Sequence, residues 1–168
     1  WNAYFQIQAQ RYDVSWPTNN PLLTMIPFQT PNDKKIQDFL SVNIEDEWKW
    51  NGWQLRLDFT PKGATHIEFQ PGATPHVTGL AGNVIVMDKN TPLSEWDVQW
   101  TIRHEYGHVL GFADCYVEFY IPSEKVMMNY QLDVNNLMCS RKGRLQQKHF
   151  DEFKRIYFGK ESQTGTAN

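Results

Sequence analysis

Two histidines four residues apart, His104 and His108, have the spacing in this sequence best suited to binding one metal ion. On a helix, residues at this spacing lie one turn apart on the same face, so both imidazoles can turn a nitrogen toward the same ion. Glu105 projects within reach of that ion without having to bind it. A carboxylate so placed can take a proton from a water molecule that a metal has made far more acidic than bulk water. The spacing therefore predicts a site for metal-assisted hydrolysis.

A third ligand is needed, because a catalytic zinc site usually has three protein ligands and one open position. Gly111 follows His108 by three residues, and a glycine can adopt the left-handed conformation that ends a helix and turns the chain. Asp114 comes after this bend and can return to the ion as an oxygen ligand. We therefore expect one catalytic Zn²⁺ bound by His104, His108 and Asp114.

The motif H-E-x-x-H-x-x-G-x-x-D at 104–114 resembles that of the metzincin zinc endopeptidases. It is similar in particular to the branch with aspartate in place of the usual third histidine, as in the small secreted snapalysin-type proteases. The resemblance implies that His104, His108 and Asp114 bind zinc and that Glu105 is the general base. It also implies hydrolysis of peptide bonds in proteins by a zinc-bound water that this glutamate activates.

The length of 168 residues is sufficient for one domain with a substantial core. We expect residues 1–160 to form a single catalytic domain and the polar residues 161–168 to be a disordered tail. The resemblance implies an α+β, metzincin-like (zincin) fold. In such a fold an upper lobe has a twisted mixed sheet and two long helices, and a small, irregular lower lobe ends in a helix.

Alternating apolar and polar residues predict the strands of this fold, at 4–14, 54–60, 65–70 and 82–88. The segment 22–28 is either another strand or an extended lead into the first helix. By resemblance, an edge strand within 74–81 lies over the cleft and pairs with extended substrate through backbone hydrogen bonds.

Capping residues mark the ends of three expected helices. Thr30 caps the first, which Gly52 ends, and Thr91 or Ser94 caps the active-site helix. A last helix ends at Gly159.

Two segments downstream resemble the methionine turn that metzincins place beneath the zinc. We prefer the one around Met138, because it precedes the last helix at close range, as in the family. The alternative is Met128. In that case Tyr130 takes the position of a family tyrosine that helps to bind zinc or to stabilise the oxyanion of the transition state.

Cys115 and Cys139 are the two cysteines of the sequence, and they follow Asp114 and Met138 directly. An even count in a hydrolase of secreted type favours a disulfide over free thiols. A role as extra metal ligands is disfavoured, because neither cysteine has the C-x-x-C spacing of a zinc cluster. We expect a secreted or extracytoplasmic protein whose signal segment or propeptide is not present in this chain.

Composition limits the partners. A net charge of −3 without a basic cluster argues against nucleic acid, and no apolar run is long enough to span a membrane. We expect a protein or peptide substrate and, by default, a monomer, and the sequence makes no prediction about structural calcium. His66 and His76 are expected to be ordinary polar or structural histidines, because neither has a partner at ligand spacing.

Two alternative functions differ from this interpretation. In an aspzincin-like protease the third ligand would be a more distant aspartate such as Asp133, although Gly111 and Asp114 already fit the nearer geometry. A zinc-containing binding protein or virulence factor would keep the metal with little turnover. The intact Glu105 argues against this, because a binding protein has no need of a base there.

Overall fold

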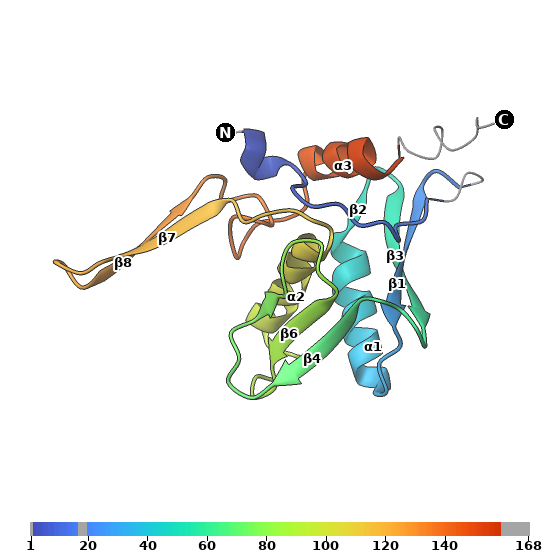
Figure 1. The fold of residues 1–168 in the computed structure, drawn as a ribbon, viewed down its shortest axis with the longest axis horizontal. Coiled ribbons are helices and arrows are strands. Elements are labelled where there is room, and N and C mark those ends of the chain that lie inside the picture. Colours follow the sequence, from blue (N-terminus) through green and yellow to red (C-terminus); the bar gives the residue numbers. More distant parts are fainter. Residues whose placement is uncertain (1, 17–19, 159–168) are drawn as a thin grey trace.

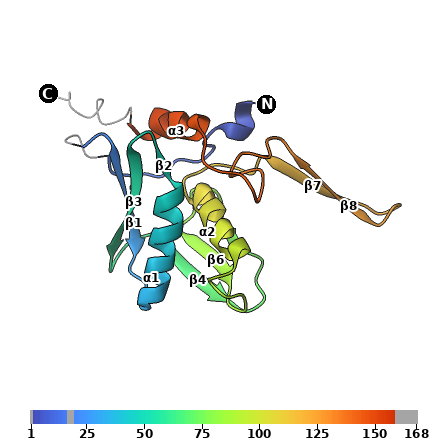
Figure 2. The same ribbon diagram turned by 180° about the vertical axis from the view of Figure 1, so that it is seen from behind.

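The computed structural model describes residues 2–16 and 20–158, so the expected tail at 161–168 and the expected helix end at Gly159 lie outside the described residues. The chain folds into an α+β arrangement in which two long helical segments pack on one face of mixed β-sheets (Figures 1 and 2). This confirms the predicted fold class. None of the described helices is both long and apolar enough to cross a membrane.

Six strands form two sheets of three strands each: β1 (Leu23–Gln29), β2 (Lys49–Trp50), β3 (Trp53–Thr60), β4 (His66–Gln70), β5 (His76–Val77) and β6 (Val84–Asp88). Both sheets are mixed in direction, with the strand orders β1-β3-β2 and β4-β6-β5. In each sheet a parallel pair is completed by a short antiparallel edge strand. A single parallel bridge between Phe28 and Thr65 joins the two sheets. The edge strand β5 lies within the segment where we expected one.

The helices bury an apolar stripe against these sheets. The first, α1 (Lys34–Leu40), continues into a π-helical turn at Ser41–Glu45, and the second is α2 (Trp96–Val109). On the first helical segment and just after it, Leu40, Ile44 and Trp48 recur every four residues, and all three are fully buried. Such a stripe stabilises the helix mainly by packing rather than by intrinsic propensity. Across the sheet face, α2 lies beside α1 (Figure 2).

Helix ends were predicted less well than helices. The N-cap of α1 is Asp33, whose side chain accepts a hydrogen bond from the Lys35 amide at 2.8 Å. Thr30 is not the cap, because the helix begins only at Lys34, and the Thr30 amide still extends the strand pairing by donating to the Thr60 carbonyl. Gly52, with φ +86°, lies in the turn between β2 and β3 rather than at a helix end. The N-cap of α2 is Glu95, without a side-chain cap, so neither Thr91 nor Ser94 has the expected role.

The segment 4–14 is not the strand that its alternation predicts. A 3₁₀ helix at Asn2–Phe5 is followed by irregular chain with one bridge, between Ile7 and Phe112. The amide of Ile7 donates to the buried carboxylate of Glu152 at 2.8 Å rather than to a strand. Side chains therefore satisfy part of the backbone that a sheet ladder would otherwise pair.

A long hairpin is the main addition to the expected lower lobe. Its strands, β7 (Tyr116–Ile121) and β8 (Val126–Gln131), pair in antiparallel register and project away from the body (Figures 1 and 2). The rest of this region is irregular up to α3 (Gln147–Phe153) and a following π-helical segment, Lys154–Phe158. The run from Tyr116 to Ile121 is rich in aromatic and β-branched residues, which is the signal that predicts such a strand.

Candidate metal centre

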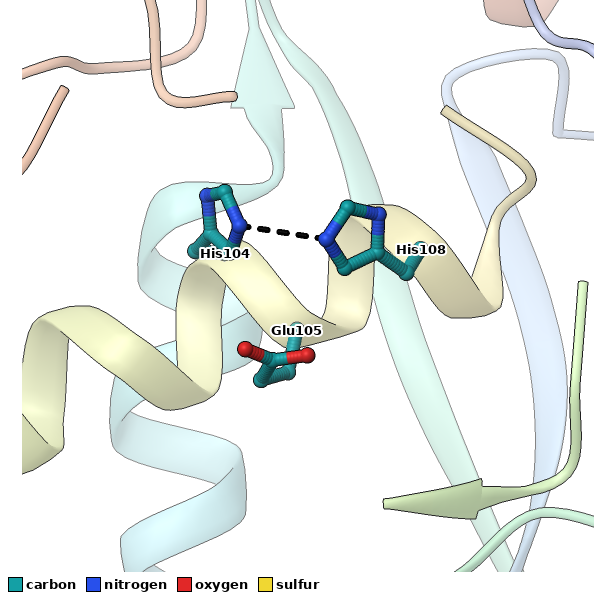
Figure 3. Close-up of side chains that lie close together, drawn as sticks. All are labelled: His104, Glu105 and His108. Carbon is teal, nitrogen blue, oxygen red and sulfur yellow. Dashed lines mark hydrogen bonds between the residues drawn. The ribbon is translucent and has the colours of Figure 1, made fainter. Parts of the chain in front are cut away.

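Helix α2 brings His104 and His108 to one face, with their Nε2 atoms 3.1 Å apart (Figure 3). Glu105 lies on the neighbouring side of the helix, and one of its carboxylate oxygens is within 4.8 Å of a nitrogen of each histidine. His104 and Glu105 are buried, at 4% and 6% exposure. The helix thus presents two imidazoles and a carboxylate on adjacent faces, and the side chains of His104 and Glu105 are largely shielded from water.

Gly111 turns the chain at the end of α2 and brings Asp114 back to this face. Its φ of +92° is the left-handed conformation that a helix-ending glycine adopts without strain. Asp114 Oδ1 then lies 3.1 Å from His104 Nε2 and 3.4 Å from His108 Nε2. Three atoms, two nitrogens and one oxygen, therefore converge on a single point beside the helix.

Replacing Gly111 with alanine should destabilise the protein. A Cβ there would overlap the carbonyl oxygen of Ala9, in addition to the strain of φ +92°. Overpacking and left-handed strain together should cost about 3 kcal/mol of unfolding free energy. The matched control is Gly72→Ala, where φ is +71° but no atom lies within 4 Å of the added Cβ. It should cost about 1 kcal/mol. Urea unfolding of both variants measures the difference, and equal losses would contradict the close approach at Gly111.

The hydrogen bonds of the two imidazoles fix which nitrogens carry protons. Nδ1 of His104 lies 3.0 Å from the Leu137 carbonyl, and Nδ1 of His108 lies 2.8 Å from the Phe112 carbonyl. A carbonyl can only accept, so each neutral ring is protonated at Nδ1 and has a lone pair at Nε2. The two Nε2 atoms and Asp114 Oδ1 are then all acceptors. Three acceptors this close repel one another unless a cation lies between them.

The spacing of these acceptors fits a tetrahedral metal ion. Ligand atoms about 2.0–2.1 Å from a tetrahedral zinc lie about 3.3 Å from one another, against the 3.1–3.4 Å found here. Asp114 Oδ1 is also buried without a hydrogen-bond donor among the described residues. His104, His108 and Asp114 could thus hold a divalent metal without rearrangement.

Electrostatics separate the role of Glu105 from that of Asp114. Burial raises the pKa of Glu105, an effect only partly opposed by His104 and His108. Burial acts in the same direction on Asp114, but the imidazoles of His104 and His108, which face its carboxylate, outweigh burial and hold the pKa of Asp114 well below its usual range. Asp114 is therefore an ionised carboxylate, as a ligand must be, whereas Glu105 takes up a proton more readily than an ordinary glutamate.

Met138 lies directly beneath the helix that presents the histidines. It is 1% exposed, and its thioether packs against Gly107, where any added Cβ would overlap the sulfur. Met128 instead occupies the middle of β8, opposite Phe119, so it does not form a turn. The geometry favours Met138 for the methionine turn.

The turn around Met138 is held by a hydrogen-bonded network that reaches His104. The Asn136 side-chain oxygen accepts from the Met138 amide at 2.8 Å and from His149 Nε2 at 2.9 Å. The next carbonyl, that of Leu137, accepts from His104 Nδ1. His149 is buried, which lowers its pKa to about 4, so it acts here as a neutral donor. The last helix thereby helps to orient a residue of the candidate metal site.

Cys115 and Cys139 form the expected disulfide, with their Cα atoms 4.5 Å apart. The Cys115 amide also donates to the Met138 carbonyl at 3.0 Å. The bridge joins the segment that contains Asp114 to the one that contains Met138. Because the two cysteines are separated by 24 positions, the bridge should contribute about 3.5 kcal/mol by restricting the unfolded chain.

The structure brings a different tyrosine to the site than the one we considered. Tyr130 is 56% exposed on β8 and pairs with Val117, on the face of the hairpin opposite to Tyr116. Tyr116 lines a cavity together with His104, His108 and Asp114. Burial and the Asp114 carboxylate raise the pKa of Tyr116 to about 12, so its hydroxyl stays protonated. Its position two residues after Asp114 was the available signal in the sequence.

Two adjoining cavities form a cleft along this face. One has a volume of about 290 Å³ and the other about 280 Å³, and they share Pro75, His104, Glu105 and Tyr116. The segment 74–80, which contains β5, lines the cleft on one side, and the hairpin lines the second cavity on another. The carboxylate of Glu105 therefore lies where the two halves of the cleft meet.

His76 lies in this cleft, which we did not expect from its sequence spacing. It lines the same cavity as Glu105, and its Nδ1 is 2.8 Å from the Thr74 carbonyl. His66, on β4, lies instead beside Glu68 at 3.3 Å and lines neither cavity. His66 thus fits the expectation of an ordinary polar histidine. His76, in contrast, lines the same cavity as Glu105 and Asp114.

Comparison with solved structures shows the same overall fold in a zinc protease. High choriolytic enzyme 1, a hatching enzyme zinc protease from the medaka fish Oryzias latipes, aligns over 86% of this chain and 93% of its own. The TM-score is 0.52 and the sequence identity is 12%. Two structures of myroilysin align at TM-scores of 0.49 and 0.42, with 9% and 14% identity, over 87% and 95% of this chain and 96% and 71% of theirs. No protein-family model and no curated protein sequence gives a significant match. At these identities the likeness establishes the fold.

Proposed function

We propose that this chain is a zinc-dependent endopeptidase of the metzincin type, with aspartate as third ligand. The observation that carries the proposal is the convergence of His104 Nε2, His108 Nε2 and Asp114 Oδ1 at 3.1–3.4 Å, with no proton donor among them in their neutral forms. The fold shared with a zinc protease and the adjoining cleft support it. The aspartate-branch motif at 104–114 supplies the ligand types.

The side chains divide the work of peptide hydrolysis between them. His104, His108 and Asp114 hold the zinc, which when bound makes a water molecule acidic and polarises the substrate carbonyl. Glu105 takes the proton from the attacking water and passes it to the leaving amine. Its buried carboxylate has an oxygen without a hydrogen-bond donor among the described residues, and its pKa is raised by burial. Both features suit a group that gains and loses a proton in each turnover.

The substrate in this proposal is an extended polypeptide. The edge strand β5 borders the cleft, and its outer side offers backbone groups that can pair with a substrate strand. The chain acts as one catalytic domain over residues 1–160, monomeric by default. A disulfide next to the site suits an oxidising compartment, which supports secretion.

Metal removal tests the proposal. The purified protein should contain about one equivalent of zinc by elemental analysis and should digest casein. 1,10-Phenanthroline, which binds zinc strongly and calcium hardly at all, should abolish digestion, and added zinc should restore it. The non-chelating isomer 1,7-phenanthroline is the control. Digestion that continues after zinc has been removed would refute the proposal.

A further inference from the structure

A third cavity, with a volume of about 170 Å³, adjoins the cleft at the N-terminal half of α2. The residues that α2 contributes to it share one helix face: Trp96, Gln99, Trp100 and Arg103. The segment 141–144 forms the rest of its lining. Trp100 and Arg141 also line the second cavity of the cleft, which reaches Glu105. The third cavity therefore extends the cleft away from the candidate metal site.

The lining of this third cavity has an excess of positive charge. Four cationic side chains contribute to it: Arg103, Arg141, Lys142 and Arg144. Arg103 and Arg144 share one buried carboxylate, that of Glu47, at 3.5 Å and 3.0 Å. Arg141 lies 3.6 Å from the Asp97 carboxylate, and the exposed Lys142 has no ion pair among the described residues. Two carboxylates thus offset four cations, which leaves two positive charges without a partner.

The fold assembles this basic cluster, which we did not expect from the sequence, because Arg103 is far from the segment 141–144 in the chain. Two backbone hydrogen bonds hold the segment. The Arg144 amide donates to the Asn135 carbonyl at 3.0 Å, and the Arg144 carbonyl accepts from the Leu137 amide at 3.1 Å. On the helix, Arg103 donates from Nη2 to the Asn43 side-chain oxygen at 3.0 Å. A cluster held in this way loses little conformational freedom when a ligand binds.

The cavities follow one another along α2 toward its N-terminus. Glu105 comes five residues after Trp100 and nine after Trp96, which corresponds to about 7–14 Å along the helix axis. An extended substrate advances by about 3.3 Å per residue. A substrate that runs along α2 from Glu105 therefore brings a side chain to the third cavity about two to four residues from the scissile bond.

We infer that the third cavity binds an acidic side chain of the substrate, about two to four residues from the scissile bond. The inference rests on the proposed function and narrows its substrate class to polypeptides with aspartate or glutamate at that distance. Guanidinium and ammonium groups are the side chains that pair best with a carboxylate. A peptide is favoured over nucleic acid as the occupant, because the cavity opens from the cleft that contains Glu105 and the whole chain has a net charge of −3.

The first test is a series of quenched fluorescent peptides in which a single glutamate or glutamine occupies each position on either side of the scissile bond in turn. At one position within the expected distance, glutamate should raise kcat/KM about tenfold over glutamine in the parent. Lys142→Glu should abolish this preference and favour lysine at the same position. The matched control is Lys62→Glu, an exposed lysine in the turn between β3 and β4, which should keep the preference of the parent. A neutral peptide should be cleaved equally by all three proteins.

Two results of this series would overturn the inference. One is a ratio of glutamate to glutamine within about twofold at every position. The other is a preference for glutamate that Lys142→Glu leaves unchanged.

A binding measurement separates the inference from the proposed function. Calorimetry with the zinc-loaded Glu105→Gln protein gives the Kd of the same peptides without cleavage. The glutamate peptide should bind about tenfold more tightly than its glutamine counterpart, and about 0.5 M NaCl should reduce the difference. If the parent cleaves no peptide, the proposed function fails, and these Kd values still decide on the cavity. Equal Kd values would refute the inference, as would binding of a short DNA duplex at Lys142 without any preference among the peptides.

Discussion

Replacing Glu105 with alanine or glutamine should lower the rate of peptide hydrolysis by about 10²–10⁴-fold while the protein keeps its zinc. The reason lies in the geometry of α2. Both histidines and Asp114 supply the converging acceptors, whereas Glu105 stands beside them with one oxygen that no described residue binds. Glutamine has nearly the shape of glutamate but cannot accept the proton of the attacking water. The loss should therefore appear in kcat, measured on a quenched fluorescent peptide with saturating zinc.

The matched control for this experiment is Glu124→Gln. Glu124 is an exposed residue in the turn between β7 and β8, so removal of its charge should leave kcat and zinc content unchanged. Burial of Glu105 also makes Glu105→Gln a mild substitution for stability, since an amide is less costly to bury than a charge. A zinc-loaded Glu105→Gln protein that hydrolyses the peptide at the parent rate would eliminate Glu105 as the base.

Replacing Asp114 with asparagine should weaken zinc binding by at least about 10²-fold, and activity should be lost together with the metal. The substitution keeps the shape of the side chain but removes the negative charge that faces His104 and His108 at 3.1 Å and 3.4 Å. A neutral amide oxygen is a much poorer ligand for zinc than a carboxylate. Competition with a fluorescent zinc chelator measures the affinity directly.

Asp133→Asn is the companion variant, because Asp133 is the more distant aspartate that could have been the third ligand. Its carboxylate instead accepts hydrogen bonds from Lys148 at 2.7 Å and from Gln146 at 3.2 Å, at the start of α3. Asp133→Asn should therefore retain the zinc affinity of the parent. If Asp133→Asn lost zinc and Asp114→Asn kept it, the ligand set proposed here would be wrong.

The part of the site that can be predicted from the sequence is the part that local geometry determines. His104 and His108 share a face because of the helical repeat, and Asp114 returns because Gly111 adopts a left-handed turn at the helix end. The Cys115–Cys139 disulfide followed from an even cysteine count and the position of each cysteine beside the site. The positions of the two histidines and of Asp114 follow from local geometry, whereas the disulfide was predicted from cysteine number and placement rather than from packing.

The other residues of the site are positioned by contacts between segments that are far apart in the sequence. His76 reaches the cleft only because β5 pairs with β6 and the following loop is hydrogen-bonded to the end of α2. Tyr116 lines the site, and Tyr130 does not, because the register of the hairpin places them on opposite faces. A shift of one residue would exchange these faces, and no motif in the sequence fixes that register.

In the fold, too, contacts with distant segments decide the structure of the N-terminal segment and the start of the first helix, so local sequence patterns fail to predict them. The alternation at 4–14 predicts a strand, yet its backbone is bound in part by the side chain of Glu152, 145 residues away from Ile7. Thr30 has the right residue type for an N-cap, but the chain at Thr30 still continues the strand pairing with Thr60, and Asp33 caps the helix three residues later. Tertiary pairing thus overrides local preference at both positions.

The most direct test of the metal site is a crystal structure of the zinc-loaded protein with anomalous data collected on both sides of the zinc absorption edge. We predict one strong zinc peak, about 2.0–2.2 Å from His104 Nε2, His108 Nε2 and Asp114 Oδ1. Glu105 should lie outside the ligand shell, within hydrogen-bonding distance of the solvent ligand. A peak away from α2, or a site in which Asp133 or Glu105 replaces Asp114 as the third ligand, would contradict the account.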